Sequence, residues 1–362
     1  MRSMAGRWYE GRMKPATQVC WMRSPLWDVS LLALGWIPFY VWVASNSVGK
    51  NSWFGDASAG FTAAVAVALA LNFAHRQYVF ILVYGDRETA AERPRGYVIA
   101  PLVALFVVCG AFWSENRALQ LAVLGVLGIW NAWHVIQQRY GLMRVYAGRA
   151  RGGLESRAAA RADRALVWSS VLVMICATAW GHAGMLEGVP QAALLLSVIG
   201  PLLTGPIVKS ALAAALLVWG VVFWRWLRIE RRSTPLARWP RWIFGLSTLA
   251  LLAIFVVHGP VVGYLVLGVA HSLEYLAFVY QFSEKKYQRG TNSVAALLLG
   301  SMGRAPIVLF PLLVAYVFLY EHRYALAYVT YYTTTSILHY LYDGWIWKLR
   351  SARVARPLEA ST

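Results

Sequence analysis

Four histidines lie on four different hydrophobic segments, and three of them have a polar partner one helical turn further along the chain. The histidines are His75, His134, His271 and His339. The partners are Gln138, Glu274 and Asp343. Residues three or four positions apart share one face of a helix, so each pair can point at a single target. Imidazoles and carboxylates are common ligands for iron, zinc, copper and manganese, so this pattern predicts a buried metal site.

Further polar side chains lie one turn before these histidines. Asn72, Asn131 and Ser336 each precede a histidine by three residues. Such groups can orient an imidazole by hydrogen bonding to the ring nitrogen that does not bind metal. We place Gln138 with these supporting residues, because amides bind transition metals poorly. We expect Glu274 and Asp343 to bind or bridge the metal, or to transfer protons during catalysis.

The composition indicates a membrane-spanning helical bundle. Hydrophobic residues make up 59% of the 362 residues and charged residues only 14%, and apolar runs of about 20 residues recur along the chain. The 18 tryptophans and 19 tyrosines cluster near segment ends, as interfacial side chains do. We predict an all-α transmembrane bundle of about ten spans. The expected spans are residues 26–44, 60–84, 97–113, 118–142, 164–181, 207–228, 242–258, 260–283, 303–320 and 324–347.

The net charge is +18, but the distribution of the basic residues indicates membrane topology rather than a nucleic-acid-binding surface. Most basic residues lie in alternate connections, where they set topology and meet anionic lipid head groups. This asymmetry places both termini in the cytoplasm and indicates a multi-pass protein of the bacterial inner membrane. We divide the chain into a basic tail (1–25), one membrane domain (26–347) and a second basic tail (348–362). Residues 190–206 are apolar but too short to span comfortably.

The site residues should share one level in the membrane. His75, His134, Glu274 and His339 each lie nine or ten residues before the basic end of their segment, which is about 15 Å along a helix. Arg76 or Arg139 is the alternative source of positive charge for the buried carboxylates. The other histidines, His182, His258 and His322, fall at the opposite ends of their segments and need no functional role.

Two strings in the chain resemble known membrane proteins. HVIQQRYG, from His134, and HYLYDGWIWK, from His339, are similar to motifs in a group of functionally unassigned bacterial polytopic membrane proteins. The scatter of histidines over several helices resembles integral-membrane non-haem iron oxygenases, including the bacterial carotenoid-cleaving dioxygenases. The pair His75-Arg76 resembles an HR pair in haem A synthase, which implies haem as an alternative cofactor. The HxxxH and HxxHH clusters of membrane desaturases are absent.

These observations predict a metal-dependent membrane oxidoreductase. We expect one or two non-haem irons to activate dioxygen on a lipid-like or other hydrophobic substrate in the cytoplasmic leaflet. Membrane lipids and a cytoplasmic electron donor are the expected partners, and nucleic acid is not. Three alternatives remain open: a haem-binding redox protein, a proton-coupled transporter that uses the same residues as a relay, and a zinc-dependent hydrolase or transferase. The three cysteines are isolated and support neither disulfides nor a thiolate site.

Overall fold

The computed structural model describes residues 20–47, 58–114, 116–150, 154–182, 205–233, 235–287, 292–322, 325–348 and 351–359. This part of the chain is all-helical and contains no strand. Its elements are α1 (Pro25–Trp27), the π-helical turn η2 (Asp28–Ala33), α2 (Ile37–Ser47), α3 (Ala59–Gly85), α4 (Arg87–Glu92), α5 (Pro94–Trp113), α6 (Arg117–Ala150), α7 (Arg157–His182), α9 (Gly205–Glu230), α10 (Pro235–Lys286), α11 (Val294–Leu299), the 3-10 turn η5 (Met302–Arg304), α12 (Ala305–Glu321), α13 (Leu326–Ile346) and α14 (Ala352–Glu359).

Eight helices in the described ranges are long and apolar enough to cross a membrane. This confirms an all-helical membrane protein, whereas the count of about ten spans is not confirmed. The two spans expected at 242–258 and 260–283 lie within the single helix α10, and α13 is not among the eight because its polar side chains lower its hydropathy. The predicted apolar stretch 190–206 lies outside the described residues except for its last two, which begin α9.

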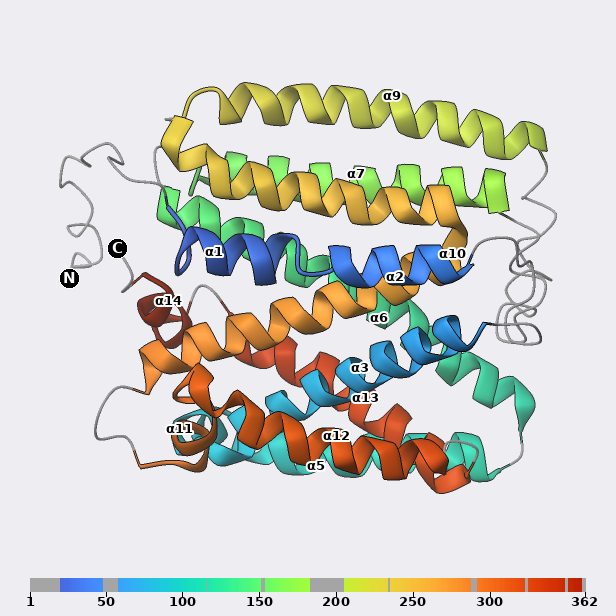
Figure 1. The fold of residues 1–362 in the computed structure, drawn as a ribbon, viewed down its shortest axis with the longest axis vertical. Helices are drawn as coiled ribbons and strands as arrows, with labels where there is room; N and C mark the ends of the chain where they lie inside the picture. Colours follow the sequence, from blue (N-terminus) through green and yellow to red (C-terminus); the bar gives the residue numbers. More distant parts are fainter. Residues whose placement is uncertain are drawn as a thin grey trace, which may run out of the picture.

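Helix α10 is bent into two legs at Gly259. This residue has φ 82° and ψ 174°, a conformation that a residue with a Cβ adopts only with strain. Pro260 follows and lacks the backbone N–H that would continue the hydrogen-bond ladder. In Figure 1 the first leg (235–258) runs across the upper part of the bundle, and the second leg (260–286) returns through its centre.

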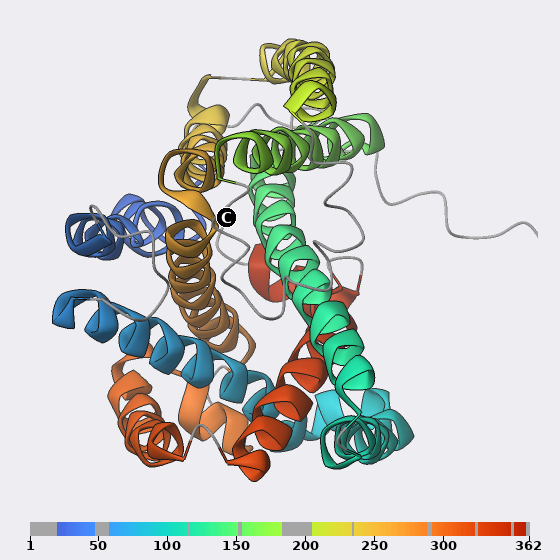
Figure 2. The same ribbon diagram turned by 90° about the vertical axis from the view of Figure 1, so that its right-hand side faces the viewer.

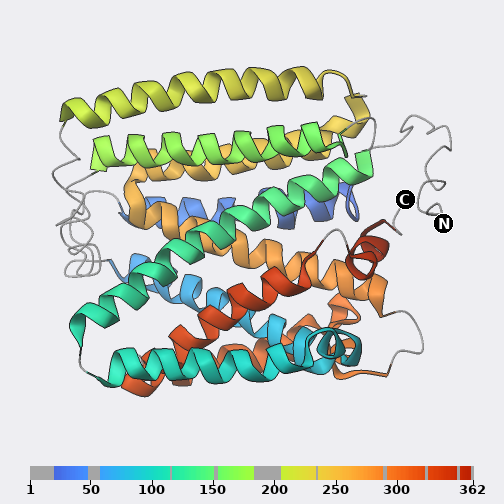
Figure 3. The ribbon, with the colours of Figure 1, turned by 180° about the vertical axis from the view of Figure 1, so that it is seen from behind.

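The bundle has an upper and a lower part around this central leg. Figure 1 places α9 and α7 at the top and α5 and α12 at the bottom, and the end-on view in Figure 2 shows the same order. Seen from behind in Figure 3, α6 runs diagonally past the centre, beside α13. The start of α1 and the whole of α14 lie at the same end of the bundle. Their cytoplasmic location stays a prediction.

A buried ionic network joins the helices of the upper part. Arg241 on the first leg of α10 donates to Asp163 of α7 at 2.7 Å and, through Nε, to Glu230 of α9 at 3.0 Å. Arg144 of α6 donates to the second oxygen of Asp163 at 2.6 Å. Arg241, Asp163 and Glu230 are each at most 1% exposed. Every charge in this network therefore has an opposite charge in contact, which a buried ion pair requires.

The centre of the bundle is formed by α3, the second leg of α10 and α13. Apolar and aromatic side chains from all three pack together, including Val79, Leu276 and Leu338. Gly268 allows α3 to approach closely, because a Cβ at this position would lie 3.2 Å from Nδ2 of Asn72. This close contact lies one turn before His271, so it helps to hold the second leg of α10 against α3 beside the histidines.

Candidate metal centre

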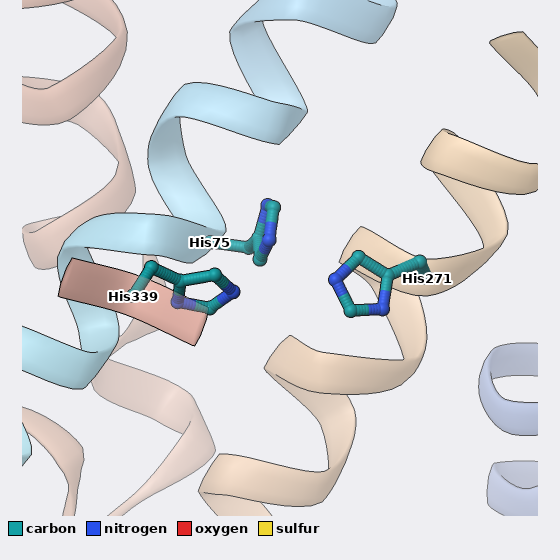
Figure 4. Close-up of side chains that lie close together, drawn as sticks. All are labelled: His75, His271 and His339. Carbon is teal, nitrogen blue, oxygen red and sulfur yellow. The ribbon is translucent and has the colours of Figure 1, made fainter. Parts of the chain in front are cut away.

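The structure brings together the four histidines of the sequence pattern. His75 comes from α3, His134 from α6, His271 from the second leg of α10 and His339 from α13. All four are buried, with exposed fractions of 1%, 6%, 3% and 0%. Figure 4 shows His75, His271 and His339 converging from three helices on one small volume. Four elements that are distant in sequence therefore meet at one place in the bundle.

The imidazole rings contact one another edge to face. The ring centroid of His75 lies 4.8 Å from those of His271 and His339. The His134 ring lies 5.1 Å from that of His271 and 5.0 Å from that of His339. One ring nitrogen from each of His75, His271 and His339 falls within 4.8 Å of the other two. Three nitrogens at such separations can surround one metal ion after small side-chain movements.

Asp343 adds a carboxylate to this cluster. Its Oδ2 lies 3.6 Å from Nε2 of both His134 and His339, and these three residues form a second group whose ligand atoms lie within 4.8 Å of one another. Its Oδ1 accepts hydrogen bonds from the Tyr275 hydroxyl at 2.8 Å and from Nε1 of Trp347 at 3.1 Å. One carboxylate oxygen is therefore held by the protein, and the other faces the imidazoles.

Several nitrogens of the cluster have no hydrogen-bond partner among the described residues. Both ring nitrogens of His271 and of His339 are in this state, as is Nε2 of His134. A buried polar atom without a partner costs roughly 1–3 kcal/mol, and most buried polar groups in proteins are paired. A metal ion would satisfy one nitrogen of each ring, so the residues present fit such an ion.

The structure places Glu274 apart from the cluster of ligand atoms. Its carboxylate forms a buried ion pair with Arg139 of α6, one of the two alternative cations considered for it. Arg139 also donates to Thr248 at 2.9 Å and to Ser247 at 3.1 Å on the first leg of α10. Glu274 belongs to neither group of ligand atoms that could hold an ion. Its negative charge is balanced by Arg139, so no metal ion is needed to compensate it.

Three of the four predicted supporting residues form side-chain hydrogen bonds with groups other than the imidazoles, and the fourth, Asn72, packs against Gly268. Gln138 donates to the backbone carbonyl of His271 at 3.2 Å, and Asn131 donates to the Tyr264 hydroxyl at 2.5 Å. Ser336 accepts from Arg76, and the Asn72 side chain lies against Gly268. None of these contacts reaches an imidazole nitrogen. These residues therefore lie around the cluster and do not orient the imidazoles directly.

The residues that do hold the ligands are Ser272, Tyr275 and Trp347. The Ser272 hydroxyl lies 3.0 Å from Nδ1 of His75, which also lies 3.3 Å from the carbonyl oxygen of Leu71. Trp347 follows Asp343 by four residues, which is also the spacing between His339 and Asp343. The contact of Trp347 with Asp343 could therefore have been predicted from the sequence. Ser272 gave no such signal, because its contact crosses from α10 to α3.

The remaining histidines lie away from the cluster. His182 contacts the carbonyl of Val256 at 2.8 Å, and His322 contacts the carbonyl of Phe318 at 2.9 Å. His258 lies 2.9 Å from the Tyr40 hydroxyl. These contacts pair each ring with a nearby protein group, so these residues serve as internal controls for the site.

A separate apolar cavity of about 200 Å³ lies between α6, α7, α9 and the first leg of α10. Met143, Trp226 and Thr248 are among its lining residues, and no histidine lines it. Thr248 also contacts Arg139, so the cavity is separated from the histidine cluster by the Arg139–Glu274 pair. We therefore do not include it in the candidate metal centre.

Comparison with protein family models, curated proteins and solved structures found no significant match to this chain. The functional argument therefore rests on the geometry of the site.

Proposed function

We propose that this protein is a metal-dependent membrane oxidoreductase whose metal ion is bound by the four histidines and Asp343. The observation that carries the proposal is the convergence of buried imidazole nitrogens that have no hydrogen-bond partner. A lone histidine in a membrane helix is readily explained as a structural hydrogen-bonding group. Four histidines, each in ring contact with two of the others beside a carboxylate, match the donor set of a transition-metal site.

A single ion fits these residues better than two. The prediction of two possible irons rested on six candidate ligands, and one of these, Glu274, is paired with Arg139. Four imidazoles and one carboxylate suffice for one ion. We expect Glu274→Gln to retain bound metal because it removes no ligand, whereas Asp343→Asn lowers metal affinity. Elemental analysis of the two purified variants makes this comparison. Loss of metal from Glu274→Gln alone would restore Glu274 as a ligand.

The contacts between the rings favour an ion over a haem. Bis-histidine haem ligation requires a macrocycle between two imidazoles. His75 contacts both His271 and His339 edge to face, and the ring centroids of the latter two are 6.3 Å apart. The rings therefore already fill the volume that the macrocycle would need. Among ions, a nitrogen-rich set with one carboxylate suits iron, and also zinc or copper.

The surrounding residues can control protons and water at this site. Tyr275 is 2% exposed and donates its hydroxyl proton to Asp343, so this pair can hold or release a proton beside the imidazoles. Burial of all four histidines excludes bulk water. Iron, when bound, would supply redox chemistry with dioxygen. A hydrophobic substrate could reach the centre from the lipid, while a cytoplasmic donor provides electrons.

Nitric oxide offers a test of the oxidoreductase assignment, because it binds ferrous iron that has an open coordination position. The full chain, purified in detergent and loaded anaerobically with Fe²⁺, should bind nitric oxide and give the paramagnetic signal of a non-haem iron nitrosyl. The His271→Ala variant should give none. Binding of zinc in preference to iron, with no nitrosyl signal from the iron-loaded chain, would contradict the assignment and favour a hydrolase.

A further inference from the structure

The Arg76 guanidinium is buried, and its contacts within the described part of the chain are all with neutral groups. Arg76 follows His75 directly in α3 and is 1% exposed. Its Nε donates to the carbonyl of Asn72 at 3.0 Å, and its Nη1 donates to the carbonyl of Tyr332 at 3.2 Å and to the Ser336 hydroxyl. Its Nη2 has no hydrogen-bond partner among the described residues. Only Nη2 of the guanidinium therefore remains available as a donor among the described contacts.

The other buried arginines described above have carboxylate partners. Arg139 pairs with Glu274, and Arg241 contacts both Asp163 and Glu230. No acidic side chain in the described ranges forms an ion pair with Arg76. An uncompensated charge inside a membrane protein is costly and marks a functional site by default. A metal ion in the neighbouring cluster would add further positive charge, which makes an anion near Arg76 more favourable.

Polar aromatic residues lie beside Arg76 and beside the histidine cluster. The Tyr332 ring covers the guanidinium at 4.0 Å, and Tyr340 lies 4.9 Å from the His134 ring, measured between centroids. The Tyr264 hydroxyl accepts a hydrogen bond from Asn131. Tyr264 is 54% exposed, so it reaches the exterior of the bundle.

We propose that Arg76 binds the carboxylate of a long-chain amphipathic acid, with the Tyr332 ring moving aside to admit it. This proposal deepens the proposed function by naming the substrate class, and it rests on that function for the role of the bound acid. The unpaired Nη2 can donate a charge-assisted hydrogen bond to a carboxylate oxygen. Because the site lies within an apolar bundle, its ligand must carry a hydrophobic chain as well as a charge.

Oleate and oleyl alcohol form a matched pair of probes, because they share the same chain and differ in the charged head. Binding of each is measured calorimetrically on the full chain in a neutral detergent, both after metal removal and after loading with Fe²⁺. Arg76→Gln removes the cation, and Arg76→Lys keeps the charge but loses the guanidinium. Arg95→Gln is the control, since Arg95 is exposed and its change removes the same charge elsewhere.

We expect the wild-type protein and Arg95→Gln to bind oleate about tenfold more tightly than oleyl alcohol, and Arg76→Gln to bind the two equally. Arg76→Lys should show an intermediate preference, which keeps the test decisive should Arg76→Gln fail to fold. No preference for oleate in the wild-type protein, or an undiminished preference in Arg76→Gln, would overturn the proposal. Oleate binding is measured on the metal-free protein as well, so it can be tested even if the protein binds no metal. Conversely, a lack of preference for oleate would overturn the role of Arg76 and leave the metal assignment intact.

Discussion

The ionic network around Arg241 and the cluster around His271 are both buried and polar, but they differ in how their polar groups are paired. Arg241 contacts two carboxylates, and Trp226 and Trp242 donate further hydrogen bonds to those carboxylates at 2.9 and 3.2 Å. At the cluster, both ring nitrogens of His271 lack a partner among the described residues. A network whose charges are all satisfied by the protein can hold helices together without a ligand. A cluster that leaves several donors and acceptors unsatisfied is better explained by a ligand that completes it.

The largest expected effect is the loss of stability when the Arg241 network is broken. Arg241→Met leaves Asp163 and Glu230 buried with less compensating charge. We expect it to lower the free energy of unfolding by about 3–5 kcal/mol. The measurement is denaturant unfolding in detergent, together with metal content per folded chain. A decrease in metal content without a loss of stability would reverse the roles assigned to the two regions.

Substitution of a metal-binding histidine should lower metal affinity more than it lowers stability. We expect His271→Ala and His339→Ala to weaken metal binding by more than about 100-fold, because each removes a direct ligand. Stability of the metal-free protein should change less than in Arg241→Met, since each change removes unsatisfied nitrogens. Titration with Fe²⁺ and competing chelator measures the affinity. His182→Ala and His322→Ala are matched controls, and weakening in them as well would remove the distinction between the two groups of histidines.

A smaller effect is expected from the residues that orient Asp343. Tyr275→Phe and Trp347→Phe each remove one hydrogen bond to Oδ1 while keeping an aromatic ring. Loss of such a contact typically lowers metal affinity by about 10–100-fold. The same chelator titration ranks these variants between wild type and His339→Ala. Unchanged affinity in both would mean that Asp343 is held without them, or is not a ligand.

The smallest effect concerns a charge pair outside the spanning segments. Burial alone would raise the pKa of Asp86, but its hydrogen bonds with Lys286 and Thr89 outweigh this and hold the pKa below its usual value. A carboxyl whose pKa is lower in the folded state stabilises the protein at neutral pH, and this contribution is lost as the pH falls below about 4 through the folded value. We expect Asp86→Asn to cost about 1 kcal/mol at pH 7 and to cost little at pH 3. Thermal unfolding at the two pH values measures the difference, and a pH-independent cost would contradict this assignment.

The sequence predicted the helical membrane fold and the meeting of four histidines, because both depend on simple periodicities. Apolar runs define spans, and distance from the basic end of a segment defines depth. These rules placed His75 and His339 on one level without knowledge of helix packing. The boundary expected between 242–258 and 260–283 coincides with Gly259, where a positive φ and the following proline bend the 52-residue helix α10.

Contacts between helices could not be predicted in this way. Glu274 follows its histidine by three residues and Asp343 follows its histidine by four, so both lie about one turn on, yet Glu274 pairs with Arg139 on a neighbouring helix. The contact of Ser272 with His75 likewise depends on how α10 faces α3. Periodicity gives the face of each helix but not the rotation of one helix against another. Partners that cross a helix interface therefore became visible only in the structure.

Elemental analysis combined with X-ray absorption at the metal edge tests the central claim most directly. The full chain, purified in detergent and loaded with Fe²⁺, should retain one iron per chain in a shell dominated by imidazole nitrogen. The same measurement on the His75→Ala/His271→Ala/His339→Ala variant should find none, while Arg241→Met retains metal in its folded fraction. A folded wild-type protein that binds no transition metal, or a triple variant that binds as much as wild type, would contradict the account.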